Sequence, residues 1–262
     1  MTAQVKPKVW HLRILSMIFM LLIGSAVGAY LAYIQPQHKV FTTTLEPPRV
    51  SDLNNYFSLF TTYRLVNDES KMTDQQVSDM VYQEFIKQLS SPELLKGYLQ
   101  EQTLVQNLAH YNDIELTQQV EQFAQAFRLS PQSQSMQLTF TSPINNSILA
   151  IELMQGMLQK ANQQAKQELY ADLVHKWKVL FQQVKLAADN NLAESWKGKL
   201  QIMLSVQPLD DKLVSYRYLQ SPSLQGSSLK QTMIKNIAIG AAVGLLLGLL
   251  FSLMVVRKSR DN

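Results

Sequence analysis

The chain has 262 residues, of which 46% are hydrophobic, and a formal net charge of +4 at pH 7. This basic excess does not indicate nucleic-acid binding. Residues 35–232 carry 17 lysines and arginines against 19 acidic residues, so the surplus of positive charge lies towards the two ends. The absence of cysteine excludes disulfides and thiolate metal sites.

Two uncharged apolar segments lie near the ends of the chain, at residues 14–34 and 237–256. A helix rises about 1.5 Å per residue and a bilayer core is about 30 Å thick, so segments of this length are sized to span it. We therefore predict transmembrane helices at 14–34 and 235–256, with a large extramembrane domain at 35–234.

Basic residues on the outer flank of each apolar segment predict the orientation. Such clusters are retained in the cytoplasm, so cytoplasmic tails are expected at 1–13 and 257–262. A cleaved signal peptide is an alternative for the first segment, because a basic start and small residues near 26–29 accompany it. The apolar core of a signal peptide is usually about 7–15 residues long, and here the uncharged run continues through Ile34.

The region after the first apolar segment predicts a strand and then a helix. Residues 38–45 are rich in threonine with Val and Phe, which is typical of a strand. The pair Pro47 and Pro48 ends it, because proline lacks the backbone donor that a sheet requires. Ser51 and Asp52 then offer a helix start, followed by apolar residues that recur on one helical face.

Two capping patterns predict the next helices. Thr73 and Gln76 have the spacing of a capping box, and Ser91 followed by proline has that of an N-cap residue with proline in the first turn. Helix is then expected over about 94–128, with an interruption near residues 112–113.

The longest predicted helix follows a strand. Residues 136–140 alternate apolar and polar side chains, which indicates a half-buried strand. Ser142 and Pro143 repeat the pairing of N-cap residue and first-turn proline. An unbroken helix over 143–188 would be about 70 Å long, so it must project from a compact domain or pack against a neighbouring copy. Gly156 is its expected weak point.

Apolar residues recur along the second half of this helix at steps of three or four. Such a pattern suits packing against another helix, and we predict that it joins neighbouring protomers. The candidates are Leu169, Leu173, Trp177, Leu180 and Val184. A break is expected at 189–191, after which helix returns at 192–205.

A final strand is expected at 212–219, shortly before the second apolar segment. It is well placed to pair with the strands at 38–45 and 136–140. The predicted fold class is α+β, in which two transmembrane helices flank a domain with a small membrane-proximal sheet and a long projecting helix.

Glycines recur at four-residue spacing in both apolar segments. Residues four apart turn through about 400°, so they form a narrow stripe where another helix backbone can approach closely. The residues are Gly24 and Gly28 in the first segment, and Gly240, Gly244 and Gly248 in the second. Glycine is also common in membrane helices, so chance and packing both stay open for the pair, whereas we favour a packing face for the triplet.

Motifs for catalysis are not found. The four histidines are isolated from one another: His11, His38, His110 and His175. Asp210 and Asp211 are adjacent and point apart, and no phosphate-cradling glycine loop occurs. Few residues follow the second apolar segment, so no cytoplasmic kinase module is expected. The sequence predicts a protein without enzymatic activity, cofactor or metal.

Several patches of sequence carry a family resemblance. They are Gln35-Pro36, the stretch 46–56 with its two prolines, the stretch 138–143 ahead of a helix rich in Gln and Ala, and the short strand before the glycine-rich second segment. In these the chain resembles the chain-length determinant family, the Wzz-type polysaccharide co-polymerases of Gram-negative bacteria. It departs from the family in length and in having only Pro222 where members carry a proline-rich segment.

The resemblance implies a non-enzymatic regulator of the inner membrane. Its domain at 35–234 would be periplasmic, and it would set the modal length of a lipid-linked surface polysaccharide, O antigen or a related glycan. The implied partners are further copies of the chain in a ring, the membrane polymerase, the lipid-linked glycan and membrane lipid.

Other functions stay open at this point. A two-span periplasmic sensor shares the layout but requires a cytoplasmic output module after the second span. An adaptor that recruits a separate cytoplasmic kinase or exporter component would need only short tails. A membrane glycosidase is not favoured, because no motif places a pair of carboxylates.

Overall fold

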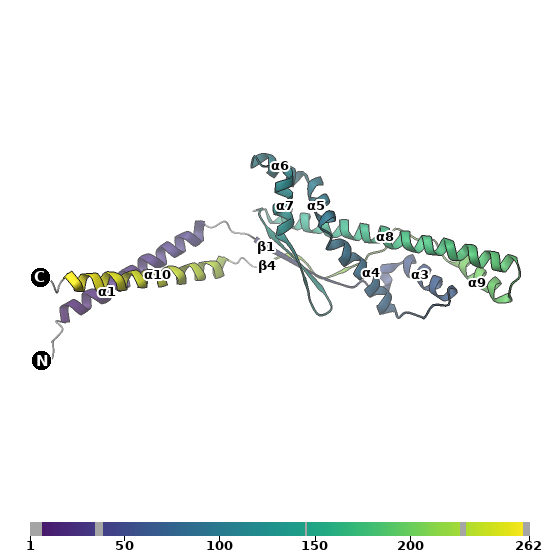
Figure 1. The fold of residues 1–262 in the computed structure, drawn as a ribbon, viewed down its shortest axis with the longest axis horizontal. Coiled ribbons are helices and arrows are strands. Elements are labelled where there is room, and N and C mark those ends of the chain that lie inside the picture. The colour runs from purple at the N-terminus through teal and green to yellow at the C-terminus, as the bar shows by residue number, and fades with distance from the viewer. Residues whose placement is uncertain (1–6, 35–38, 145, 226–228, 259–262) are drawn as a thin grey trace. The chain divides into compact units, whose positions relative to one another are not determined.

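The computed structural model describes residues 7–34, 39–144, 146–225 and 229–258 (Figure 1). Two compact units divide the chain: one is formed by its two ends, and the other by residues 40–225. The expected α+β class is confirmed for the second unit, where helices accompany a four-stranded sheet. Gln35, Pro36, His38 and the outer parts of the predicted tails lie outside the described residues.

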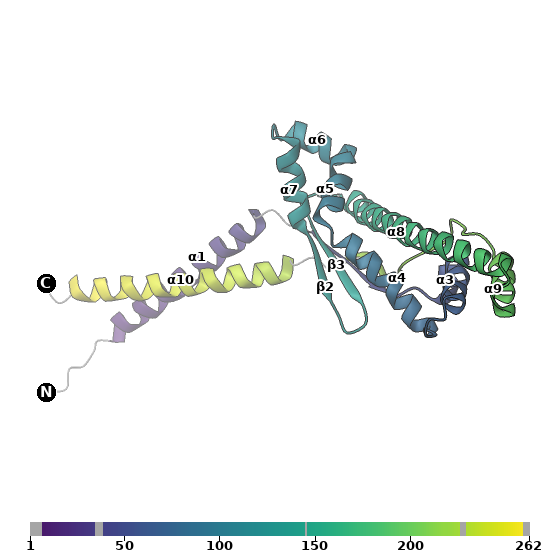
Figure 2. The same ribbon diagram turned by 45° about the vertical axis from the view of Figure 1, so that its right-hand side comes forward.

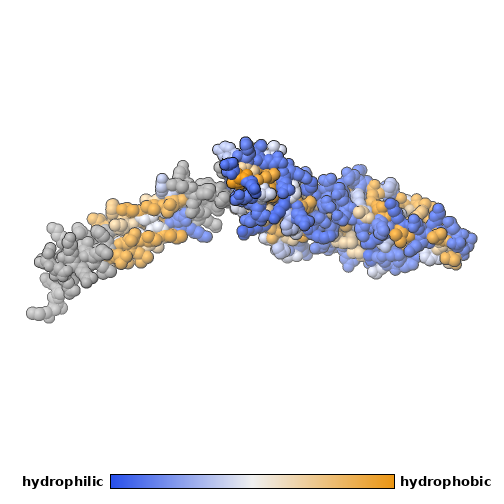
Figure 3. Space-filling view, turned by 45° about the horizontal axis from the view of Figure 1, so that its top comes forward, coloured by the Kyte–Doolittle hydropathy of each residue, from blue (hydrophilic) through white to orange (hydrophobic). Residues whose placement is uncertain are grey.

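The unit formed by the chain ends is a pair of helices, α1 (Pro7–Ile34) and α10 (Leu229–Lys258), which pack against each other. Large apolar side chains stand exposed along both, and Figure 3 shows them as hydrophobic where the side chains are described. Over the described residues, no helix combines the length and the apolar character that crossing a membrane requires. Transmembrane helices at 14–34 and 235–256 therefore stay a prediction.

The sheet has the strand order β2-β3-β1-β4. Its strands are β1 (Lys39–Glu46), β2 (Phe127–Pro131), β3 (Met136–Ser142) and β4 (Arg217–Gln225). The strands expected at 38–45 and 136–140 are confirmed. The expectation that helix continues to 128 is wrong, because β2 starts at Phe127 and pairs antiparallel with β3. The Phe127 ring stacks on Phe140 with their centroids 4.3 Å apart, a long-range contact that outweighs the local helical pattern.

The last strand lies further along the chain than the expected 212–219. The reason is that the backbone before it bonds to helices: the Asn162 side-chain oxygen accepts from both the amide and the hydroxyl of Ser215, at 2.8 and 2.6 Å, and Val214 donates its amide to the Asp52 carbonyl. Strand β4 starts only after this stretch. It occupies an edge of the sheet, where Pro222 is tolerated.

Two short helices follow β1, α2 (Val50–Leu53) and α3 (Asn55–Val66). They are separated by Asn54, whose φ of 50° interrupts the helix. The predicted start at Ser51 or Asp52 is wrong, because Arg49 is the N-cap residue and its backbone amide donates to the Asp52 carboxylate at 2.8 Å.

The capping patterns of the next helices are confirmed. Helix α4 (Asp74–Leu89) starts with the capping box of Thr73 and Gln76, and helix α5 (Pro92–Glu101) with Ser91 as N-cap. Helices α6 (Thr103–Tyr111) and α7 (Leu116–Ala126) follow. The predicted interruption is present, with Asp113 at a φ of 53°, and a second break at Gln102 was not foreseen.

Helix α8 (Ser147–Asp189) has 43 residues and is therefore about 65 Å long. It begins at the Asn146 cap rather than at Ser142, because the Ser142 hydroxyl accepts from the Ile144 amide in a local turn. The helix is continuous at Gly156, so the predicted weak point is wrong. The predicted break after 188 is confirmed, and α9 (Glu194–Ser205) turns back along α8.

Three apolar clusters hold this unit together along α8. Figure 2 shows α4 and α9 lying along this helix. The largest joins the sheet, α4, α5 and α7 to the first half of α8, where alanines at 150, 161 and 165 let neighbouring elements approach closely. The two smaller clusters join α3, α9 and the segment before β4 to the second half. Helix α8 is thus the element to which almost every other part of the unit is attached.

Candidate functional site

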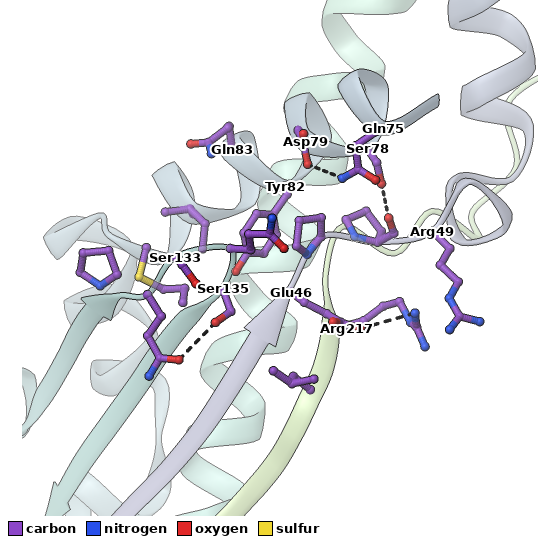
Figure 4. A pocket seen from close by; sticks show the side chains of 18 of the residues that line it. Glu46, Arg49, Gln75, Ser78, Asp79, Tyr82, Gln83, Ser133, Ser135 and Arg217 are labelled. Atoms are coloured by element: carbon purple, nitrogen blue, oxygen red, sulfur yellow. Dashed lines mark hydrogen bonds and ion pairs between the residues drawn. The ribbon is translucent and has the colours of Figure 1, made fainter. Parts of the chain in front are cut away.

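A broad groove of about 1340 Å³ lies at the end of the sheet where β1 and β2 finish and β3 and β4 begin (Figure 4). One wall is helix α4 and the other is the turn 131–136 between β2 and β3. Residues 46–50 after β1 and the start of β4 complete it. The four segments come from distant parts of the sequence. The sheet order brings the strand ends together, and hydrogen bonds of Ser78 and Tyr82 attach α4 to them.

The base of the groove is held by fixed polar contacts. The buried Tyr82 hydroxyl donates to the Leu45 carbonyl at 2.9 Å, and burial raises the pKa of this phenol to about 12. The buried Ser78 hydroxyl donates to the Pro48 carbonyl. Arg217 lies 3.5 Å from the Glu46 carboxylate, and the same guanidinium is 3.7 Å from Asp52, so two acids position this base. These groups form a rigid floor.

The rim of the groove consists of uncharged amides and hydroxyls together with a few carboxylates. On α4, Gln75 donates to the Asp79 carboxylate at 2.8 Å, and Gln83 is exposed. On the facing turn, Ser135 donates to the Gln132 side chain at 3.3 Å. The other polar rim residues are Asp74, Ser133 and Gln134. The charged groups that line the groove are three carboxylates and two arginines, with no lysine.

The predicted glycine stripes lie between α1 and α10. The structure brings Gly24 against Gly240, where a Cβ on either residue would overlap the carbonyl oxygen of the other. A Cβ on Gly244 would overlap the Met20 carbonyl, and one on Gly28 the carbonyl of Asn236. The helices therefore touch through their backbones at these positions.

Gly248 occupies the end of the same stripe with a little more room. A Cβ there would lie 3.2 Å from Met17 Cα, which is tight but involves no carbonyl overlap. The close approach thus loosens from Gly240 towards Gly248. All five glycines named from the sequence face the partner helix within this unit.

The predicted protomer-packing residues of α8 have partners within the same chain. Leu173 is buried in the cluster with α3, and Leu180 and Val184 are buried in the cluster with α9. Leu169 and Trp177 pack half-buried against these clusters. The periodicity of the sequence predicted a face of α8 that packs against other helices. In the structure, α3 and α9 of the same chain pack on this face.

The remaining polar candidates are scattered. His110 and His175 are exposed on α6 and α8, and the side chains of His11 and His38 lie outside what the structure describes. Asp211 pairs with Lys166 at 2.5 Å, and the Asp210 carbonyl accepts from the Tyr170 hydroxyl at 2.6 Å. Among the described residues, no three potential metal ligands gather in one place.

Sequence reasoning did not find the groove. Its residues are separated by up to 173 positions, and no single stretch carries a motif. The one local signal is the run of Gln and Ser at 132–135, which is uncharged and strongly polar between two strands.

Comparison with known proteins identifies the fold of the chain. No protein-family model and no curated protein matches the chain. Among solved structures, a full-length bacterial polysaccharide co-polymerase matches with a TM-score of 0.59 and 12% identity, over 98% of this chain and 99% of that chain. The chain has the polysaccharide co-polymerase fold.

A fragment of WzzB, a polysaccharide co-polymerase from Salmonella Typhimurium, also matches. Its TM-score is 0.50 at 13% identity, over 71% of this chain and 95% of that chain. The resemblance drawn from sequence patches is thereby confirmed for the fold of the chain. At this level of identity, the match shows that the proteins share an architecture. It does not show that individual residues share a role.

Proposed function

We propose that this chain regulates the length of a lipid-linked bacterial surface polysaccharide, O antigen or a related glycan, without catalysing its synthesis. The observation that supports this best is the match to a full-length polysaccharide co-polymerase over 98% of the chain, which includes residues of both units. The sensor and adaptor alternatives have no comparable support.

The proposal places the protein in the bacterial inner membrane. In it, α1 and α10 contain spans at 14–34 and 235–256, the tails at 1–13 and 257–262 are cytoplasmic, and residues 35–234 are periplasmic. The support is the basic outer flanks and the large apolar side chains exposed on both helices. The backbone contact at Gly24 and Gly240 would hold the two spans together.

The proposed partners are further copies of the chain, the membrane polymerase, the lipid-linked glycan and membrane lipid. Ring-like self-association belongs to the proposal, with the long helix α8 as the element that neighbouring protomers share. The contacts of Leu173, Leu180 and Val184 within the chain support a stiff α8, which a side-by-side assembly needs.

Deletion of the gene tests the proposal. Polymer synthesis should continue, but the modal band in gel electrophoresis of the surface polysaccharide should be replaced by a broad distribution of lengths. Complementation with the intact gene should restore the band. A deletion strain whose banding is unchanged contradicts the proposed function.

A pair of variants extends this test to the glycine contact. Gly240→Leu inserts a side chain into the backbone contact with Gly24, whereas Ala242→Leu places the same side chain at an exposed position of the same helix. Gly240→Leu should fail to restore the modal band, and Ala242→Leu should restore it. Restoration by both would show that the glycine contact is dispensable for regulation.

A further inference from the structure

We propose that the groove between α4 and the 131–136 turn binds an uncharged oligosaccharide segment of the growing glycan. The inference rests on the proposed function, which it deepens by assigning a contact site for the polymer. It is carried by the size of the groove, the chemistry of its rim and the charge of its lining.

The size of the groove fits an oligosaccharide. Its volume of about 1340 Å³ exceeds the range of about 300–1,000 Å³ that is usual for pockets holding one small molecule. It is also partly open to solvent, and it lies between a helix on one side and a turn on the other (Figure 4). A ligand that fills it must therefore be larger than a monosaccharide, and a chain can continue out of it.

The rim chemistry suits sugar hydroxyl groups. Each hydroxyl both donates and accepts a hydrogen bond, and a planar amide offers a donor and an acceptor side by side. Amides and hydroxyls line both walls: Gln75, Gln83, Gln132, Ser133, Gln134 and Ser135. Exposed Gln83 and Gln134 can adjust to a ligand, whereas Tyr82 and Arg217 beneath them are held by hydrogen bonds and ion pairs. A fixed floor limits the entropy that binding must overcome.

The charge of the lining selects against acidic polymers. Three carboxylates stand against two arginines, and one of these, Arg217, already pairs with Glu46 and Asp52. A polyanionic chain would meet Asp74 and Asp79 along the α4 wall, with Arg49 as the second arginine of the lining. An uncharged segment suffers no such repulsion.

A second copy of the chain is the competing occupant, and the lining disfavours it. The centre of a protein interface is enriched in exposed apolar and aromatic side chains. In the groove, Tyr82 is only 6% exposed, and Ile86 and Met136 are half-buried. Leu219 is the large hydrophobic residue of the lining that stands well exposed, at 64%.

Direct binding gives the first test. The full-length protein in detergent is titrated with lipid-free O polysaccharide from the host strain, and separately with polygalacturonate as a polyanion. The intact chain should bind the first and not the second. Gln83→Ala combined with Gln134→Ala should weaken binding about ten-fold, since two side chains that each offer a hydrogen bond to the glycan are lost. The control, Gln182→Ala with Gln183→Ala on the exposed face of α8, should bind as the intact chain does.

Thiol labelling gives a second test that does not depend on affinity. Because the chain has no cysteine, Gln83→Cys and Gln182→Cys each introduce a single reactive site. The O polysaccharide should slow maleimide labelling at 83 and leave labelling at 182 unchanged. If labelling at 83 is slowed by raising the protein concentration without glycan, a second copy fills the groove and the inference falls.

The outcomes separate this inference from the proposed function. If deletion of the gene alters the length distribution but the glycan neither binds nor protects position 83, the groove inference is wrong and the regulatory function stands. If the glycan protects position 83 while deletion leaves the banding unchanged, the groove assignment stands and the proposed function is wrong.

Discussion

The two halves of helix α8 differ in how they are covered. The first half, up to Ala165, has seven buried residues and lies against the sheet, α5 and most of α4, whereas the second half has five buried residues and is covered by α3, α9 and the start of α4. Leu186 is exposed on the second half, and so is Leu192 in the turn beyond it. One continuous helix therefore passes from a thick core into a thin layer, and its local stability should fall along its length.

The largest expected effect comes from removing a core side chain in each half. Leu158 is completely buried in the first half, so Leu158→Ala should lower the free energy of unfolding by about 2–5 kcal/mol. Urea unfolding of the full chain, followed by circular dichroism, measures this. Leu180→Ala in the second half is the matched change, and Leu180 is 6% exposed.

Hydrogen exchange on the same two variants tests whether the halves open separately. Leu180→Ala should speed amide exchange in the second half of α8 and in α9 while leaving amides around 150–165 protected. Equal acceleration in both halves would show that α8 opens as one unit and that the comparison between its halves is wrong.

Glycine-to-alanine changes should have opposite signs in two helices. Alanine normally stabilises a helix by about 1 kcal/mol relative to glycine, and this is expected for Gly198→Ala in α9, where an added Cβ meets open space. At Gly156 an added Cβ would overlap the Tyr98 hydroxyl, which donates to the Leu153 carbonyl at 3.0 Å. Gly156→Ala should therefore destabilise the chain by about 1–3 kcal/mol in thermal or urea unfolding.

A double variant identifies the cause of the Gly156 effect. Tyr98→Phe removes the hydroxyl that the new methyl group would meet, so Gly156→Ala with Tyr98→Phe should be less destabilised than the sum of the two single changes. Strict additivity would show that the Tyr98 hydroxyl does not limit this position.

Alkaline pH should destabilise both halves of the unit. Burial raises the pKa of Tyr98, which packs on the first half, to about 12, and that of Tyr170, on the second half, to about 12 as well. The folded state thus keeps these protons after the unfolded chain has lost them at about pH 10. Stability is fully present below pH 10 and declines as the pH rises from 10 to 12. Urea midpoints across this range, compared with those of Tyr98→Phe, should show a shallower decline in the variant.

The smallest expected effect concerns an ion pair at the thin end of the unit. Lys199 on α9 lies 2.5 Å from the Asp68 carboxylate, which is 78% exposed. Lys199→Ala should cost no more than about 1 kcal/mol, and less at high ionic strength, because exposed ion pairs are screened. A larger, salt-insensitive loss in urea unfolding would show that α9 depends on this contact more than on Met203 and its apolar neighbours.

Local features were predicted from sequence, and long-range ones were not. The capping box at Thr73 and the cap at Ser91 involve residues three apart, so a short window contains all that decides them. Strand β2 forms because it pairs with β3. Strand β4 starts late because the backbone before it bonds to Asn162, more than fifty residues away. Within the chain α3 and α9 cover the predicted face of α8, and packing of this face between protomers stays a prediction, because periodicity indicates that a face is covered but not by which chain.

The same difference between local and long-range features applies to the two candidate sites. The glycine stripes could be named from sequence because close approach of two helices requires the same residue type at a fixed spacing. The groove could not, because Tyr82, Gln134 and Arg217 come together only through the strand order and the packing of α4 on β1.

The sheet order has a consequence for how the chain is made. Strand β1 lies inside the sheet between β3 and β4, yet it is the first strand to be synthesised. Its partner at the edge of the sheet is β4, and in this pair Val40 lies opposite Gln225. Until nearly the whole polypeptide has emerged, β1 has a backbone edge that can join a neighbouring nascent chain instead. Closure of the sheet must therefore wait until β4 has been synthesised.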